Sequence, residues 1–129
     1  MFSKASRKNT LVIIFLTFAS LLGFPIIAPA LPSVRDAFNI STSDIGLVMA
    51  AYSAPGIIFI PVMGILADRY GKKKVLLPSM LLFAVGGTAC AVANNTETLL
   101  LFRFLQGIGA CALATINVSW AADLFEDDE

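Results

Sequence analysis

The chain has 129 residues, of which 57% are hydrophobic and only 14% charged, and its formal net charge is zero. Soluble domains are typically about 45–50% apolar and about 25% charged, so this composition excludes an ordinary soluble domain. A net charge of zero provides no overall attraction to nucleic acid, and we expect no nucleic-acid partner.

Four long segments without charged residues make up most of the chain. Each is about as long as the 18–20 residues that an α-helix needs to cross roughly 30 Å of hydrocarbon. The uncharged segments are residues 9–34, 45–67, 75–96 and 104–122. We therefore predict an all-α membrane protein with four transmembrane helices, over residues 10–31, 44–66, 75–93 and 98–120.

The outer half of the first predicted span contains Pro25 and Pro29. Each proline removes a backbone hydrogen bond, which is tolerated in lipid only where neighbouring helices, side chains or cavity water satisfy the freed carbonyl. The sequence leaves open a simple kink and a helix that lines a cavity. Ala28-Pro29-Ala30 also resembles a signal-peptide cleavage site, but the long apolar run and the three later spans favour a retained helix.

The connection that follows, residues 32–43, is predicted to be a loop outside the membrane. Ser41 with Asp44 three residues later is typical of a capping box that begins the second span. The second span is rich in small residues, which let membrane helices approach closely. Its polar groups near mid-span, Tyr52 and Ser53, fit either packing or the lining of a cavity.

The third predicted span is almost entirely apolar, and Gly86-Gly87 indicates close packing or a hinge. Cys90 and Cys111 lie in the third and fourth spans. The chain has no histidine and no C-x-x-C pair, so we predict two small buried side chains and no metal, redox or cofactor site.

Basic residues are gathered before the first span and between the second and third. They are Lys4, Arg7, Lys8, Arg69, Lys72, Lys73 and Lys74, whereas the two other connections contain only Arg35. Basic loops remain on the cytoplasmic side of membranes. We therefore expect a multi-pass protein of the cell (plasma) membrane whose N-terminus is cytoplasmic.

The connection between the second and third spans has the pattern Gly64-x-x-x-Asp68-Arg69-x-Gly71-Lys72-Lys73-Lys74. Gly64 would allow close packing at the end of the second span. Asp68 lies at the membrane edge and needs a basic side chain or a helix N-terminus as partner, and Gly71 permits a tight reversal. A loop that only sets the topology would explain the lysines but not the spacing of glycine, acid and glycine.

The outer half of the fourth span contains Arg103-x-x-Gln106-Gly107-x-Gly109-Ala110. An arginine near the centre of a span costs about 2.5–3.5 kcal/mol, so it usually faces a protein interior or a watery cavity. The alternative is that Arg103 extends to the outer interface, which is only about two helical turns away. Gln106, three residues later, lies on the same helical face and favours a shared polar site.

The first pattern resembles the signature loop of the major facilitator superfamily, G-x-x-x-D-R-x-G-R-K-K, and it falls between the second and third spans as it does there. Lys72 replaces the usual arginine, which keeps the charge but loses the planar, bidentate guanidinium. The second pattern resembles the fourth-helix signature R-x-x-Q-G-x-G-A of the drug:proton antiporter branch. The resemblance extends over residues 11–129.

The resemblance implies two six-helix halves that rock about a substrate site near the membrane midplane. The chain would then be part of the N-terminal half, with the C-terminal half as its missing partner. Arg103 would couple proton movement to export, with Gln106 in support. The implied cytoplasmic latch consists of Gly64, Asp68, Arg69, Gly71, Lys72 and Lys73. The candidate cavity-lining residues are Thr17, Ser20, Thr115 and Asn117.

We therefore expect a transporter that exports small organic compounds or drugs by alternating access, with the substrate, protons and the lipid bilayer as partners. One alternative is an uptake carrier for a sugar or metabolite. Another is a membrane anchor or assembly subunit without transport activity. A four-helix transporter that works as a dimer is disfavoured because the first span has no glutamate. An enzyme is disfavoured because histidine, paired cavity carboxylates and a nucleophile beside a base are missing from the sequence pattern.

Overall fold

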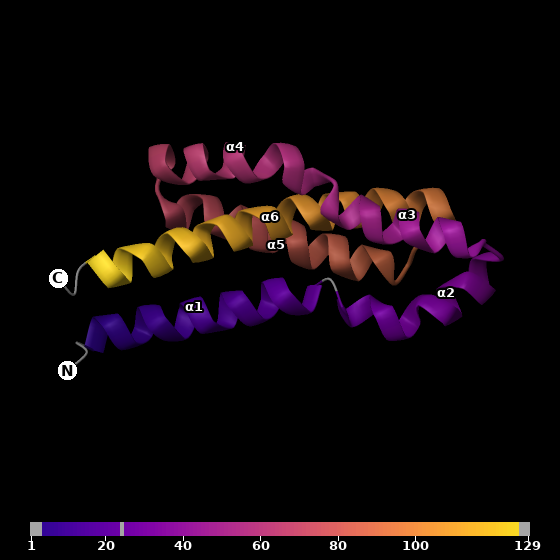
Figure 1. The fold of residues 1–129 in the computed structure, drawn as a ribbon, viewed down its shortest axis with the longest axis horizontal. Coiled ribbons are helices and arrows are strands. Elements are labelled where there is room, and N and C mark those ends of the chain that lie inside the picture. Colours follow the sequence, from indigo (N-terminus) through magenta and orange to yellow (C-terminus); the bar gives the residue numbers. More distant parts are fainter. Residues whose placement is uncertain (1–3, 24, 127–129) are drawn as a thin grey trace.

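The computed structural model describes residues 4–23 and 25–126, and the described chain is helical throughout apart from its short connections (Figure 1). In chain order the elements are α1 (Lys4–Gly23), the 3-10 helix η1 (Pro25–Ala30), α2 (Leu31–Phe38), α3 (Thr42–Ser53), α4 (Pro55–Tyr70), α5 (Lys72–Cys90) and α6 (Thr96–Glu126). Four stretches are long and apolar enough to cross a membrane: Leu11–Phe38, Thr42–Tyr70, Lys72–Cys90 and Thr96–Asp123. This confirms the prediction of an all-α protein with four membrane-spanning stretches.

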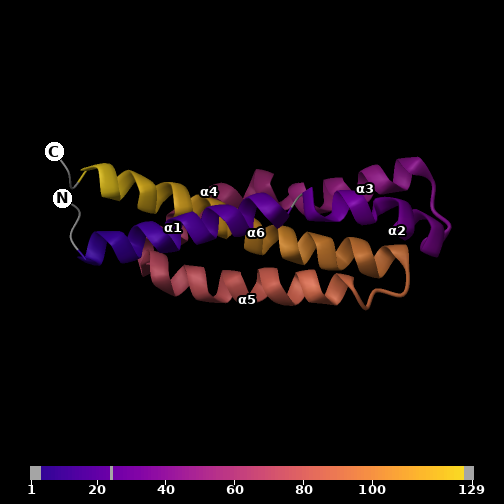
Figure 2. The same cartoon turned by 90° about the horizontal axis from the view of Figure 1, so that it is seen from below.

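Helix α6 is the centre of an elongated bundle (Figures 1 and 2). It packs against α1, α3, α4 and α5, and 50% of its spanning window is buried, against 22% for that of α5. The beginning of α1, the α4–α5 connection and the end of α6 lie at one end of the bundle. The α2–α3 and α5–α6 connections lie at the opposite end. The pattern from Gly64 to Lys74 therefore lies at one end of the bundle, beside the end of α6, and the pattern from Arg103 to Ala110 lies on α6 itself.

Proline and close packing shape the break after α1. Gly23 is the last residue of α1, and a Cβ there would come within 2.9 Å of the Phe83 ring and would also contact the Tyr52 hydroxyl. The chain continues from Pro25 as a tighter 3-10 helix that includes Pro29. Because proline has no N–H to donate, a short 3-10 segment replaces regular α-helix here.

The prediction of a loop over residues 32–43 is wrong, because residues 31–38 form helix α2. Pro32 lies in the first turn of α2, where a missing N–H costs nothing. Leu31, Val34 and Phe38 share one face of α2 and pack against a cluster around Val48 and Leu99. The proline and the neighbouring charges obscured this apolar face in the sequence.

The predicted capping box at the start of α3 is confirmed. The Asp44 backbone N–H donates to Ser41 Oγ at 3.3 Å, and the Ser41 backbone N–H donates to Asp44 Oδ2 at 3.0 Å. Helix α3 ends at Ser53, and Pro55 begins α4 and is buried. The second membrane-spanning stretch is therefore two consecutive helices rather than one.

The packed interior lies on α6, and the outer faces are apolar. One buried cluster joins Ala67, Val75, Leu76, Leu113 and Ile116, which come from α4, α5 and α6. Large apolar side chains cover the outside, including Ile57 at 85% exposure and Leu77 at 65%. Apolar surface of this extent is expected where lipid, and not water, surrounds a protein.

Candidate functional site

Arg103 lies inside the bundle on α6. Its side chain is only 5% exposed, and Nη1 donates a hydrogen bond to Gln106 Oε1 at 3.1 Å. Gln106 is also buried, at 6% exposure. Of the two positions that the sequence left open for this arginine, the structure therefore selects the protein interior over the outer interface. The two polar residues form one site, as the i, i+3 spacing predicted.

Tyr52 on α3 forms the wall opposite Arg103. The Arg103 Cζ lies 5.7 Å from the centroid of the Tyr52 ring, within the range of a cation–π interaction. Tyr52 is 8% exposed, so of its two predicted settings it takes packing. Its mid-span position was the only signal in the sequence, and nothing there connected it with an arginine 51 positions later in the chain.

Two glycines of α6 allow it to pack closely against α3 and α4 on one side of this site and against α5 on the other. A Cβ on Gly107 would collide with the Tyr52 backbone carbonyl and approach Pro55 Cγ to 3.2 Å. A Cβ on Gly109 would lie 2.7 Å from the Ser79 carbonyl oxygen. Because backbone atoms block both positions, α6 has this register only with glycine at each. The signature glycines thus fix the height of Arg103 relative to α3 and α5.

Helix α5 packs against Gln106 and forms the remaining wall of the site around Arg103 and Gln106. A Cβ on Gly86 would come within 2.9 Å of Gln106 Cα, and one on Gly87 within 3.0 Å of Gln106 Nε2. Of the two sequence interpretations of Gly86-Gly87, close packing is therefore the one observed. Small residues on α5 make room for the polar side chain of α6.

The site has an excess of positive charge. Within the described residues Arg103 takes part in no ion pair, and its buried Nε has no hydrogen-bond partner. A guanidinium keeps its proton in proteins, so it acts as a fixed cation and not as a proton carrier. Such a cation in a low-dielectric interior favours a carboxylate and opposes a second positive charge nearby.

The candidate cavity-lining residues fall into two groups. Asn117 Nδ2 on α6 donates to Thr17 Oγ1 on α1 at 2.5 Å, and Thr17 Oγ1 donates to its own helix at Ile13 O. The Asn117 Oδ1 atom is buried and has no partner in the described part of the chain. Thr115 instead donates to Cys111 O and faces a groove between α4 and α6. The side chain of Ser20 lies outside the described residues.

The predicted latch loop reverses at Gly71, whose φ of 94° is a conformation that favours glycine. Lys72 Nζ crosses to the end of α6, where it donates to Ser119 O at 3.0 Å and forms an ion pair with Asp123 Oδ2 at 2.5 Å. Nothing in the sequence spacing connects Asp123 with the residues around Gly71. Its place at the membrane edge beside a basic loop was the signal for it.

Of the other latch residues, Asp68, Arg69 and Lys73 are exposed, and Gly64 is half-buried. Asp68 lies on a groove of about 500 Å³ between α4 and α6 and makes no ion pair within the described residues. The Arg69 Cζ lies 5.8 Å from the Tyr70 ring centroid, and Lys73 is exposed. A Cβ on Gly64 would meet Thr115 Cγ2 at an ordinary 3.7 Å, so this glycine is not required for close packing inside the bundle.

Comparison with known proteins identifies relatives. The sequence model of the Major Facilitator Superfamily matches residues 13–129. The chain is 34% identical over 127 residues to the bacillibactin exporter of Bacillus subtilis (strain 168), covering 95% of the chain and 32% of that protein. It is 32% identical over 117 residues to the multidrug transporter MdfA of Edwardsiella piscicida, covering 91% and 28%. The MdfA of Yersinia pestis bv. Antiqua (strain Angola) is 31% identical over 132 residues, covering 98% and 32%. The chain spans about a third of the length of these curated relatives.

Proposed function

Because this multi-pass membrane chain belongs to the Major Facilitator Superfamily, we propose that it is part of a transporter that exports small organic compounds in exchange for protons. The observation that carries this proposal is Arg103, a cation that is 5% exposed in a spanning helix. A charge near the centre of a span costs about 2.5–3.5 kcal/mol, which a purely structural helix would avoid. Two kinds of relative are named as an exporter and a multidrug transporter, which favours export over uptake.

Arg103 and Gln106 are the proposed coupling residues. Arg103 keeps its proton, so it acts through its charge on a carboxylate that gains and loses the transported proton. The uncharged spanning segments over residues 9–34, 45–67, 75–96 and 104–122 supply no such carboxylate. We therefore assign the proton-carrying acid to a part of the transporter outside these segments. Thr17, Ser20, Thr115 and Asn117 are the proposed lining of the substrate cavity.

The proposed latch contains Gly64, Asp68, Arg69, Gly71, Lys72 and Lys73. Lys72 holds α5 to α6 through Asp123, whereas Asp68 is exposed beside the α4–α6 groove. We assign the exposed acid to a contact with the opposing half of the transporter, made in one access state and broken in the other. An electrostatic contact at an exposed edge is weak enough to open and close in each cycle.

Replacement of Arg103 tests the coupling. We compare Arg103→Ala and Arg103→Lys, at the natural full length of the protein, with Arg35→Ala, which removes an exposed arginine that forms an ion pair with its neighbour Asp36. The readout is the accumulation of a fluorescent cationic dye in inside-out vesicles under an imposed proton gradient. We expect more than a tenfold loss for Arg103→Ala and none for Arg35→Ala. Undiminished proton-driven accumulation in Arg103→Ala would refute the coupling role.

Vesicles of both orientations test the direction of transport. An exporter accumulates substrate in inside-out vesicles, whereas an uptake carrier accumulates it in right-side-out vesicles. Accumulation of a sugar or metabolite in the latter alone would favour the uptake carrier.

We further propose that the protein lies in the cell membrane with its N-terminus in the cytoplasm. The beginning of α1 and the basic α4–α5 loop lie at the same end of the bundle, and both carry basic residues (Figure 1). Single cysteines at Lys73 and Asn95, placed in a background without Cys90 and Cys111, report the sidedness. An impermeant maleimide added to intact cells should label position 95 and spare position 73, and the reverse pattern would invert the topology.

A further inference from the structure

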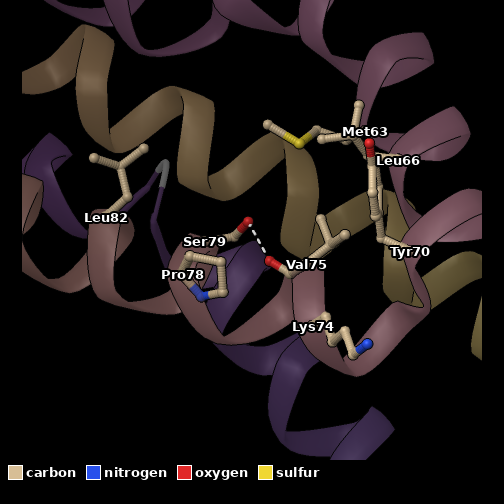
Figure 3. Close-up of a pocket in the computed structure, with 8 residues that line it drawn as sticks. All are labelled: Met63, Leu66, Tyr70, Lys74, Val75, Pro78, Ser79 and Leu82. Atoms are coloured by element: carbon tan, nitrogen blue, oxygen red, sulfur yellow. Dashed lines mark hydrogen bonds between the residues drawn. The ribbon is translucent and has the colours of Figure 1, made fainter.

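A second groove runs between α4 and α5, on the outer surface of the bundle (Figure 3). Its volume is about 450 Å³, and eight residues line it: Met63, Leu66, Tyr70, Lys74, Val75, Pro78, Ser79 and Leu82. The Ser79 hydroxyl donates to the Val75 carbonyl at 2.8 Å, within its own helix, so it offers no donor to a ligand. The wall of the groove is therefore apolar along most of its length.

One end of the groove is polar and basic. Tyr70 and Lys74, both exposed, lie next to the Gly71 reversal. Lys74 belongs to no ion pair among the residues that the structure describes, so its charge has no carboxylate to neutralise it there. Arg69, whose Cζ lies 5.8 Å from the Tyr70 ring centroid, places a second cation beside this residue of the groove. The groove is thus apolar along most of its length and positively charged at one end.

The length of the groove fits one membrane leaflet. From Lys74 to Leu82 the α5 wall rises about 12 Å, at roughly 1.5 Å per residue. Half of a hydrocarbon core is about 15 Å thick, so the slot covers most of the leaflet next to the basic loop and stops before the other. A transmembrane helix from a second protein crosses both leaflets and would extend past the end of this slot. A lipid acyl chain needs only one.

We propose that this groove binds an anionic phospholipid, with an acyl chain along Leu66, Val75 and Leu82 and its phosphate held by Lys74. Basic pockets between transmembrane helices bind anionic head groups, and each lysine near the surface contributes about 1 kcal/mol, or roughly fivefold in affinity. Tyr70 has the amphipathic ring that is typical of the membrane interface. The inference depends on insertion into a membrane but not on transport, substrate or coupling ion.

Lipid binding by the purified protein at its natural full length tests the proposal directly. Native mass spectrometry in detergent compares phosphatidylglycerol with phosphatidylcholine of the same acyl chains. We expect phosphatidylglycerol to bind at least fivefold more tightly, and Lys74→Gln to remove that preference. Lys73→Gln is the matched control, because it removes the same charge from the same loop at a position that does not line the groove. It should retain the preference within twofold.

A groove-filling variant and a competitor separate the alternatives. Leu82→Trp should lower the affinity for both lipids, since it occupies the acyl slot, and excess inorganic phosphate should not displace the lipid. Equal losses in Lys73→Gln and Lys74→Gln would mean general surface charge and would overturn the proposal. Equal binding of the two lipids, or a dimer in place of the lipid-bound chain, would overturn it as well.

Discussion

The surroundings of Arg103 and the loop between α4 and α5 are built in opposite ways, although both carry charges at a membrane-embedded helix. Arg103 and Gln106 are buried, and both are walled by α3 and α5. At the α4–α5 reversal around Gly71, Lys72 forms an ion pair with Asp123 of α6, and Asp68 and Lys73 are exposed. The first region is therefore enclosed by helices of this chain, whereas the second leaves most of its charges exposed.

The difference arises because one region buries its charge and the other exposes its charges to solvent. A buried guanidinium needs fixed partners, because an unpaired charge in a low-dielectric interior is costly. Rigid helix contacts through glycine supply that order. An exposed charge is solvated and costs little on its own, so it can form and break contacts. Disturbing the packing should thus damage the first region more than the second.

The largest effect is expected for Gly107→Ala. The new methyl would collide with the Tyr52 backbone carbonyl, which has no rotamer by which to move away. Overpacking of this kind costs about 3 kcal/mol at the upper end of its usual range. The midpoint of thermal unfolding in detergent, followed by circular dichroism, should fall clearly.

Gly46→Ala is the matched control for that change. A Cβ on Gly46 meets nothing within 4 Å, so alanine should be neutral or stabilising, by up to about 1 kcal/mol through helix propensity. Equal destabilisation of the two variants would show that glycine contributes flexibility here and not close packing. The contrast between a packed interior and a tolerant surface would then fail.

Replacement of Tyr52 should have the next largest effect. Tyr52→Leu keeps an apolar side chain but removes the ring from the Arg103 guanidinium, at a cost of about 2 kcal/mol for a desolvated cation–π contact. Tyr52→Phe keeps the ring face and should lose much less stability. The two variants are compared in the same unfolding assay. Equal losses would mean that the hydroxyl, and not the ring, supports the site.

The fold was largely predictable because a membrane imposes simple requirements. Long apolar segments must be helices, and the uncharged segments revealed four of them. The failure at α2 has an equally simple cause. An eight-residue helix with two charges and a proline does not resemble a span, and its apolar face is recognisable only against Val48 and Leu99. The break between α3 and α4 was indicated by Pro55 itself, because proline has no N–H to donate within a helix.

In the candidate sites, contacts within one helix were predictable from the sequence, whereas contacts between helices were not. The i, i+3 spacing of Arg103 and Gln106 was sufficient because a helix places such residues together. The Tyr52 and Asp123 contacts depend on which helices become neighbours, and sequence spacing within one helix does not contain that information. Local patterns therefore located the groups that need partners, while tertiary packing decided the partners.

A smaller effect is expected at the Lys72–Asp123 ion pair. The side chains are 18% and 56% exposed, so solvent screens the pair and limits its contribution to about 0.5–1 kcal/mol. A double-mutant cycle with Lys72→Met and Asp123→Asn measures this coupling, which should shrink at high salt. The parallel cycle with Lys73→Met should give none. Coupling at Lys73 would indicate that the loop rearranges between partners.

The smallest effect on stability is expected for Asp68→Asn, and it is the sharpest test of the comparison. The change removes a charge but little volume, at an exposed position without an ion pair in the described chain. The stability of the chain should therefore stay within about 0.5 kcal/mol. If Asp68 closes on the opposing half of a transporter, the same change at natural full length should slow transport severalfold. A loss of stability above about 1 kcal/mol would instead place the partner of Asp68 within this bundle, and the contrast with the enclosed surroundings of Arg103 would then fail.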